Sequence, residues 1–158
     1  MNLLRLTSAL FLVLPLALLR GETVDLLEED WSVALAAANA SGAHLYVAFL
    51  GEDWSVASDR FASKVLDTDT FRDFARENLV YCPVRARRSP KLSKNETARL
   101  QAVVIHFDIK SYPTFLLIAP DGSEILRHGY RTDSAREYVD LLKAILPPES
   151  SADPQSTP

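Results

Sequence analysis

Two serines three positions apart, Ser55 and Ser58, carry hydroxyl groups that could act as nucleophiles. They follow Trp54 at the predicted start of a helix, where free backbone N–H groups face outward. A catalytic serine needs an adjacent base that a third group orients. The three histidines fall in a predicted strand, in or near a predicted helix and at a predicted hairpin end: His44, His106 and His128. No spacing joins them to a serine in a recognisable triad, so we predict no catalytic residue.

Cys82 is the only cysteine in the chain, so no internal disulfide can form. Its apolar neighbours favour a buried and inert thiol, whereas the arginines at positions 85, 87 and 88 would lower its pKa if it were exposed. An exposed thiol would allow a thiol-disulfide oxidoreductase that works through Cys82 alone or with a partner's thiol. We favour the inert thiol and keep the oxidoreductase as the alternative. One cysteine and three scattered histidines show no metal-ligand spacing, so we expect no metal site and no cofactor.

A basic segment follows the predicted strand that holds Cys82. Residues 85–99 contain one acid, Glu96, and six basic side chains: Arg85, Arg87, Arg88, Lys91, Lys94 and Arg99. The simpler interpretation is a solvated loop over residues 85–94 without a function of its own. As a partner site, the segment would suit an acidic protein or an anionic surface polymer. Aromatic residues are absent from it, which argues against nucleic-acid binding.

The whole chain has 158 residues, a formal net charge of −4 and 47% hydrophobic residues, which is enough for one globular domain with its own core. Residues 1–21 combine a positive start with an apolar run too short to span a bilayer, which is the pattern of a signal peptide. The residues before Gly21 mark the cleavage point poorly, so a retained N-terminal membrane anchor is the alternative. We expect the domain over residues 22–146 and a disordered Pro/Ser-rich tail over residues 147–158.

Periodicity and capping residues predict an alternation of helices and strands. An apolar run over residues 43–50 is typical of a central strand that is covered on both faces. Pro83 places the next strand, over residues 79–84, at an edge or at a strand end. Pro120-Asp121-Gly122 lies between two apolar runs and predicts a hairpin. The other expected elements are a helix over 31–40 ended by Gly42, helices capped by Asp53, Thr70 and Asp133, a helix over 96–107, and strands over 115–119 and 124–128.

This order of elements resembles the thioredoxin fold, and particular residues carry the resemblance. Trp54 stands where the family has the tryptophan before its first cysteine, and Tyr112-Pro113-Thr114 is similar to the family's cis-proline motif. The strand that ends at Gly51 is similar to the secreted, reductase-associated branch of the thioredoxin-like superfamily. The likeness covers about residues 25–146. It implies an α/β fold with a central mixed sheet of four to five strands, flanked by helices on both faces.

The chain departs from the family at the residues that perform redox chemistry. Ser55 and Ser58 stand at the positions of the family's attacking and resolving cysteines, and Ala48 stands where redox-active relatives have a buried carboxylate. Dithiol exchange needs a thiolate that attacks and a second thiol that resolves the mixed disulfide. A serine hydroxyl does neither, so we expect a redox-inactive protein.

The resemblance also implies a binding surface that does not need cysteines. In relatives the backbone of the residue before the cis-proline, here Tyr112, pairs with an extended substrate peptide. We therefore expect an extended polypeptide or a partner protein to bind a secreted or periplasmic protein across Trp54, Ser55, Ser58, Tyr112 and Pro113. Two alternatives remain. In the first, Pro113 is required by the fold and no ligand binds beside it. In the second, the domain is purely structural and its partner site is the basic segment.

Overall fold

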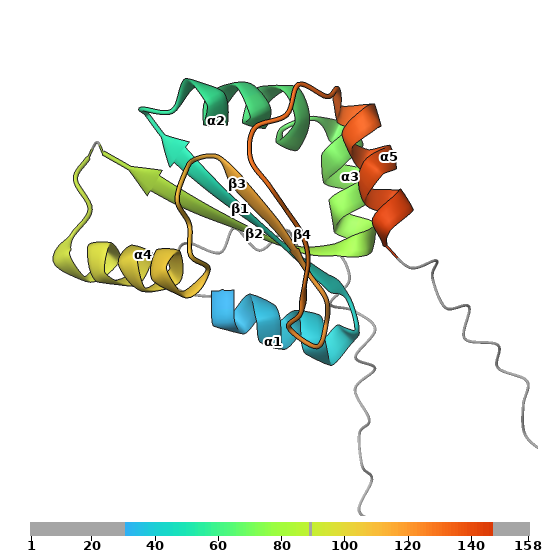
Figure 1. Ribbon diagram of the computed structural model, residues 1–158, viewed down its shortest axis with the longest axis horizontal. Coiled ribbons are helices and arrows are strands. Elements are labelled where there is room, and N and C mark those ends of the chain that lie inside the picture. Colours follow the sequence, from blue (N-terminus) through green and yellow to red (C-terminus); the bar gives the residue numbers. More distant parts are fainter. Residues whose placement is uncertain (1–30, 89, 147–158) are drawn as a thin grey trace, which may run out of the picture.

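The structure is a computed structural model that describes residues 31–88 and 90–146 (Figure 1). The predicted signal peptide over residues 1–21 and the predicted tail over residues 147–158 lie outside the described residues. Within the described ranges, no helix combines the length and the apolar character needed to cross a membrane.

The described chain alternates helices and strands around one four-stranded sheet. In chain order the elements are α1 (Trp31–Ser41), β1 (His44–Glu52), α2 (Val56–Phe61) with its π-helical continuation η2 (Ala62–Leu66), α3 (Asp69–Asn78), β2 (Leu79–Arg87), α4 (Lys94–His106), β3 (Thr114–Ile118), β4 (Glu124–His128) and α5 (Ala135–Ile145). The strand order is β2-β1-β3-β4, with β1 and β2 parallel and the other two pairs antiparallel. The sheet is therefore mixed, and the α/β fold that the resemblance implied is confirmed.

Strand β1 runs through the centre of the sheet and separates two apolar cores. Alternate side chains of a strand point to opposite faces. Tyr46, Ala48 and Leu50 accordingly belong to one core, while the residues between them belong to the other. Helices α2, α3 and α5 cover the first face, and α1 and α4 cover the second (Figure 1). Seven consecutive residues of β1 are buried as a result, which confirms the doubly covered strand predicted from its apolar run.

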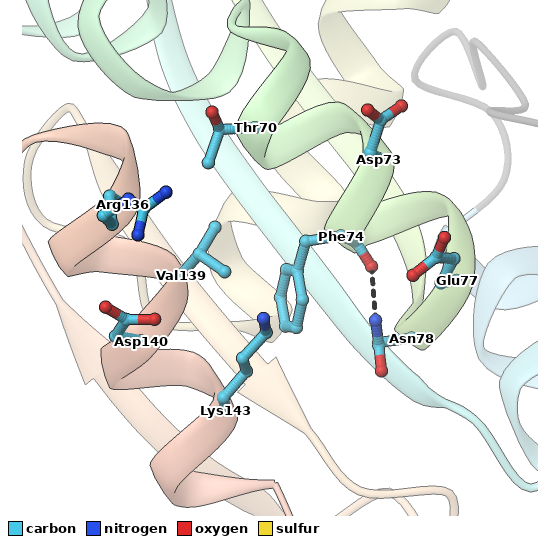
Figure 2. A pocket seen from close by; sticks show the side chains of 9 residues that line it. All are labelled: Thr70, Asp73, Phe74, Glu77, Asn78, Arg136, Val139, Asp140 and Lys143. Atoms are coloured by element: carbon cyan, nitrogen blue, oxygen red, sulfur yellow. Dashed lines mark hydrogen bonds between the residues drawn. The ribbon is translucent and has the colours of Figure 1, made fainter.

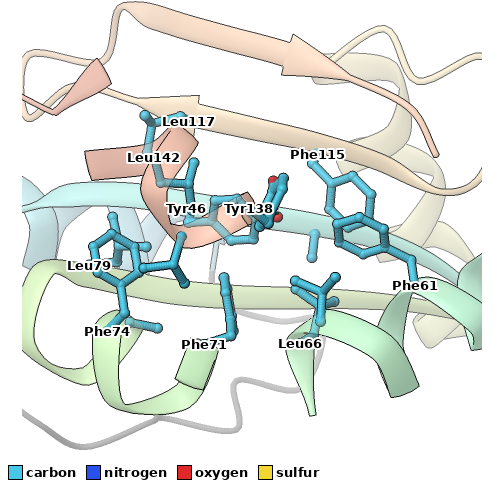
Figure 3. Packing of buried hydrophobic residues seen from close by; sticks show 14 of the residues in the cluster. Tyr46, Phe61, Leu66, Phe71, Phe74, Leu79, Phe115, Leu117, Tyr138 and Leu142 are labelled. Carbon is cyan, nitrogen blue, oxygen red and sulfur yellow. Dashed lines mark hydrogen bonds between the residues drawn. The ribbon is translucent and has the colours of Figure 1, made fainter. Parts of the chain in front are cut away.

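The first core contains two tyrosines that are almost completely buried (Figure 3). The hydroxyl oxygens of Tyr46 and Tyr138 lie 2.7 Å apart, and Tyr138 Oη lies 2.6 Å from Nε2 of His128. The other ring nitrogen, Nδ1, lies 2.7 Å from the carbonyl oxygen of Gly129. A carbonyl oxygen only accepts, so in the neutral ring Nδ1 carries the proton and Nε2 accepts from Tyr138. Tyr46 then donates to Tyr138, and the buried chain of hydrogen bonds has one consistent direction.

Three local predictions near turns and edges are confirmed. Gly42 follows α1 with φ +70°, the left-handed backbone that commonly ends a helix. Pro83 lies in β2, which is an edge strand of the sheet, so the ladder hydrogen bond that proline lacks is tolerated there. The hairpin between β3 and β4 closes where predicted, with the backbone N–H of Ala119 donating to the carbonyl oxygen of Ser123 at 2.8 Å.

Three predicted helix caps are wrong by one or two residues. The observed caps of α2, α3 and α5 are Ser55, Thr68 and Ser134, where the sequence favoured Asp53, Thr70 and Asp133. Each observed cap accepts a hydrogen bond from the backbone N–H three residues further on. Asp53 has φ +65°, a left-handed backbone, and its carboxylate accepts from the backbone N–H of Arg88 instead. Aspartate and serine are both good caps, and the path of the chain out of the strand selects between them.

The loop that we expected over residues 85–94 is also wrong at both ends. Arg85 and Arg87 belong to β2, and Lys94 is the first residue of α4. The register explains the longer strand, because β2 pairs with β1 as far as the partners Glu52 and Arg87. The basic side chains therefore project from a strand end and a helix start as well as from the connection between them.

Candidate functional site

Ser55 and Ser58 form a hydrogen-bonded pair at the start of α2. Their Oγ atoms are 2.9 Å apart, and Ser55 Oγ also accepts from the backbone N–H of Ser58 at 3.2 Å. Ser58 Oγ accepts from the backbone N–H of Gly51 at 3.0 Å. Both side chains are buried, with exposed fractions of 8% and 2%. The pair therefore connects the helix start to the end of β1.

No hydrogen bond within the described residues joins a histidine to this pair. The three histidines lie at the start of β1, at the end of α4 and at the end of β4: His44, His106 and His128. Among the described residues, the buried polar side chains are those of Ser55, Ser58 and Thr114, so no carboxylate is buried beneath the pair. Ala48, which stands where redox-active relatives have a carboxylate, is completely buried in the first core, the one that contains Tyr46 and Leu50. In the described part of the chain, the serines thus have neither the base nor the orienting group that a serine nucleophile needs.

Gly51 allows the strand end to pass closely beneath the start of α2. A Cβ at this position would lie 2.7 Å from Cζ2 of Trp54 and 2.8 Å from Cβ of Ser55. Real Cβ atoms do not approach other atoms so closely, so a larger residue would displace the tryptophan ring or the serine. The close contact depends on how the helix packs on the strand, and the sequence analysis missed it.

Three contacts hold the ring of Trp54. Its Nε1 donates to the carbonyl oxygen of Ala86 in β2 at 2.7 Å. The ring of Tyr112 contacts it edge-on, with centroids 5.3 Å apart. The guanidinium carbon of Arg88 lies 4.6 Å from the ring centroid, which is a cation–π geometry. The tryptophan therefore bridges the end of β2 and the loop that precedes β3.

Tyr112 and Pro113 form that loop, and the peptide bond between them is cis. The side chain of Tyr112 is half-buried, and burial raises the pKa of its phenol. Its backbone N–H and C=O form no hydrogen bond with other described residues. An extended chain laid along this loop would find a free donor and a free acceptor.

Two residues that the sequence analysis missed lie beside this loop and the serine pair. Val56, directly after Ser55, is 70% exposed. Helical spacing places it away from the buried Phe61 of the same helix, and this was the signal available in the sequence. Gly129 follows β4, and a Cβ on it would lie 3.6 Å from the carbonyl oxygen of Pro113, so the two loops are adjacent. We use the name Trp54 surface for Trp54, Val56 and Tyr112, which are half-buried or exposed, together with Ser55, Ser58 and Pro113, which the structure buries beside them.

Cys82 lies in β2, away from the Trp54 surface. Its side chain is 2% exposed and belongs to the second core, together with Val47, Val84 and Val103. Helices α1 and α4 cover this core, whereas α2 lies on the other face of the sheet (Figure 1). The structure therefore places the thiol of Cys82 out of reach of solvent and on the opposite face from Ser55.

We use the name basic patch for five cationic residues of the basic segment, whose surroundings differ from one another: Arg85, Arg87, Arg88, Lys91 and Lys94. Arg87 is half-buried and pairs with Glu96 at 2.8 Å. Hydrogen bonds from Ser93, and secondarily the charge of Arg87, lower the pKa of Glu96. The remaining members form no ion pair within the described residues: Arg85, Arg88, Lys91 and Lys94. One member of the patch, Arg88, also contacts the Trp54 surface, so two features that the sequence presented separately are joined.

A shallow hollow of about 290 Å³ lies between α3 and α5 (Figure 2). Phe74 and Val139 form its apolar part, with the Nζ of Lys143 5.8 Å from the phenylalanine ring centroid. Three carboxylates and two cations line it: Asp73, Glu77, Asp140, Arg136 and Lys143. These charges largely compensate one another, so the hollow selects no ligand by its charge, and none of its residues belongs to the Trp54 surface.

Comparison with known proteins agrees with this geometry. A family profile described as a thioredoxin-like domain matches residues 31–146. The disulfide bond reductase DsbH of Chlamydia pneumoniae is 20% identical over 118 residues, which cover 75% of this chain and 71% of that protein. A solved DsbH oxidoreductase has a TM-score of 0.68 at 18% identity, covering 88% of this chain and 93% of the other. The oxidised C-terminal domain of Neisseria meningitidis DsbD has a TM-score of 0.56 at 12% identity, covering 73% and 91%. These similarities show the shared fold.

Proposed function

Because the chain belongs to the thioredoxin-like domain family, we propose that it is a redox-inactive member that binds an extended polypeptide or a partner protein at the Trp54 surface. The observation that carries the proposal is the backbone of Tyr112, whose N–H and C=O have no partner within the described residues. The ring of Tyr112 contacts that of Trp54, and Val56, two residues after Trp54, exposes an apolar side chain. Backbone groups recognise any extended chain by strand addition, and such binding does not depend on cysteines.

The serine pair supports the redox-inactive part of the proposal. Thiol-disulfide exchange requires attack by a thiolate, and the hydroxyls of Ser55 and Ser58 are engaged in neutral hydrogen bonds that hold the helix start. The relatives named as reductase or oxidoreductase share the fold of this chain. Thiol-disulfide chemistry at the start of α2 would need sulfur atoms at positions 55 and 58, where this chain has the hydroxyl oxygens of serine. Burial of Cys82 weighs against the alternative enzyme that would use this thiol.

A secretory location is part of the same proposal. The pattern of residues 1–21 supports export as a secreted or periplasmic protein, and a retained leader would attach the domain to a membrane. The domain that follows this leader, over residues 22–146, would then carry the Trp54 surface outside the cytoplasm, with residues 147–158 as its tail.

Disulfide reductase turnover on a disulfide-bonded protein tests the redox part. We compare the wild type with Ser55→Cys/Ser58→Cys and with Cys82→Ser. We expect no turnover from the wild type or from Cys82→Ser, and measurable turnover from the double cysteine variant, because the scaffold already brings the two side chains together. Turnover by the wild type that is lost in Cys82→Ser would refute the proposal and make Cys82 the reactive group.

NMR titration of the full chain with an unstructured polypeptide tests the binding part. Val56→Asp puts a charge on the apolar part of the Trp54 surface and should weaken binding at least about fivefold. Ile105→Asp is the matched control, since Ile105 is a 76%-exposed β-branched residue on α4, compared with 70% for Val56 on α2. Equal effects of the two substitutions, or resonance shifts that avoid Trp54 and Tyr112, would contradict the assignment of the site.

A further inference from the structure

We propose that Arg88 makes the Trp54 surface selective for acidic polypeptides, by binding a carboxylate near the segment that pairs with Tyr112. This inference rests on the proposed function of the surface and specifies the chemistry of its ligand.

The backbone of Arg88 is held beside the start of α2. Parallel pairing of β1 with β2 ends at the partners Glu52 and Arg87, so the next residue of each strand lies alongside the other. There the carboxylate of Asp53 accepts from the backbone N–H of Arg88 at 3.1 and 3.2 Å. A side chain that starts from a fixed backbone position loses less conformational freedom when it binds a ligand.

The guanidinium of Arg88 lies over the ring of Trp54 and has no carboxylate partner among the described residues. Its carbon lies over the ring of Trp54 at 4.6 Å, and the side chain is exposed. A cation–π contact takes up none of the conventional hydrogen-bond acceptors, and the five N–H donors of a guanidinium lie in its plane and point outward. No carboxylate of the described residues forms an ion pair with Arg88. The planar fork of donors matches a carboxylate, which it can bind through two parallel hydrogen bonds.

One tryptophan ring connects Arg88 to the peptide-pairing loop. Trp54 contacts Arg88 on one side and the ring of Tyr112, at 5.3 Å between centroids, on another. The guanidinium carbon of Arg88 and the ring centroid of Tyr112 therefore lie within about 10 Å of each other, a separation that an extended chain spans in about three residues at 3.3 Å per residue. We expect the acidic residue of the ligand about three positions from the residue that pairs with Tyr112.

The charge around Arg88 favours the same ligand. The chain is acidic overall, with a net charge of −4, yet Arg85, Lys91 and Lys94 lie close to Arg88 in sequence and have no ion pair within the described residues. A cationic region on an acidic protein attracts anionic ligands and repels cationic ones. We favour a polypeptide over an anionic polymer, because the N–H and C=O of Tyr112, which no other described residue engages, match a peptide backbone.

The test is an NMR titration of the full chain with three synthetic peptides of one extended sequence, which carry aspartate, asparagine or lysine at the position three residues from the centre. We expect the wild type to bind the aspartate peptide about three- to fivefold more tightly than the asparagine peptide and to bind the lysine peptide most weakly. Raising the salt concentration from about 0.05 to 0.5 M should remove this preference, since salt screens exposed charges. Arg88→Gln should abolish the preference and Arg88→Glu should reverse it.

Arg136→Glu is the matched control, because Arg136 is an exposed arginine on α5 and lies outside the Trp54 surface. It makes the same change in net charge as Arg88→Glu and should keep the preference for the aspartate peptide. The inference is overturned if the wild type binds the three peptides equally, or if Arg88→Glu and Arg136→Glu behave alike. In that case, sensitivity of the asparagine peptide to Val56→Asp would still support the proposed function, whereas no binding of any peptide would refute both. Binding of a sulfated polysaccharide that requires Arg88, without a preference among the peptides, would also overturn the inference and identify an anionic polymer as the ligand.

Discussion

Ser58 donates a hydrogen bond to Ser55 across 2.9 Å at the start of helix α2. The two sulfurs of a disulfide are covalently joined at about 2.05 Å. The two hydroxyl oxygens are also close neighbours, but a hydrogen bond and not a covalent bond joins them. The same hydroxyl of Ser58 accepts from the backbone N–H of Gly51. Oxygen at this position thus supports the junction of β1 and α2 by hydrogen bonding, and this role has measurable consequences for stability.

Removal of the Ser58 hydroxyl should destabilise the fold. In Ser58→Ala the buried N–H of Gly51 loses its acceptor, and a buried unsatisfied donor costs about 1–3 kcal/mol of unfolding free energy. Urea unfolding measures the loss. Ser63→Ala is the control, because the hydroxyl of Ser63 is exposed and donates only to the carbonyl oxygen of Arg60, so the change there should stay within about 0.5 kcal/mol. Equal losses in the two variants would show that the Ser58 bond adds nothing.

The buried tyrosine chain predicts an order of effects for two similar substitutions. Tyr138→Phe removes the central hydroxyl, so both Tyr46 and Nε2 of His128 lose their partner. Tyr46→Phe removes the terminal hydroxyl and leaves Tyr138 still donating to His128. We expect Tyr138→Phe to be more destabilising by about 1 kcal/mol or more in urea unfolding. A larger effect of Tyr46→Phe would contradict the central position of the Tyr138 hydroxyl in this chain of hydrogen bonds.

The free energy of unfolding should decrease as the pH is lowered through the range where histidine titrates. Burial is the main cause that lowers the pKa of His128 below its usual value of 6.5, and Arg131 adds to this while Gly129 and Asp133 oppose it. The unfolded chain therefore binds this proton at a higher pH than the folded chain does. The contribution to stability is complete above pH 6.5 and is lost as the pH falls through the lowered pKa of the folded state.

Unfolding free energies measured from about pH 7.5 to pH 5 test this. His128→Gln should flatten the dependence, because glutamine does not titrate. Burial also lowers the pKa of His44, so His44→Gln serves as the comparison and should leave the His128 contribution in place. Carboxylates with lowered pKa, such as Asp133 and Glu137, act at lower pH than this window. A dependence that His128→Gln leaves unchanged would contradict the assignment.

The thiol of Cys82 should react only when the protein opens. With 2% of its side chain exposed, we expect modification by an aromatic disulfide reagent to be at least about 100-fold slower in the native protein than in concentrated guanidinium chloride. Val56→Cys provides the control, since a thiol at this 70%-exposed position should react rapidly while Cys82 stays silent. Rapid reaction of the wild type would revive the alternative of an enzyme that uses Cys82.

Much of the fold followed from patterns within short stretches of the chain. The apolar run of β1 predicted burial on both faces, and Gly42 and Pro83 marked a helix end and an edge strand. The helix caps were less predictable, because Asp53 and Ser55 have similar capping chemistry. Asp53 has a positive φ, and its carboxylate accepts from the backbone N–H of Arg88, which lies 35 residues further along the sequence.

For the candidate site too, the sequence determined some properties and only the tertiary structure decided others. Oxygen in place of sulfur at Ser55 and Ser58 is a property of the sequence, and it excludes dithiol chemistry at these residues wherever the chain places them. The burial of Cys82 and the contact of Arg88 with Trp54 depend on the parallel register of β1 and β2 and on the helices that cover each face. Residue periodicity reports which side of an element is apolar, whereas the neighbour across the sheet is chosen by the packing of the whole domain. The absence of dithiol chemistry at Ser55 and Ser58 is therefore predictable from the sequence alone, while the proposed selectivity for acidic ligands rests on contacts between distant segments.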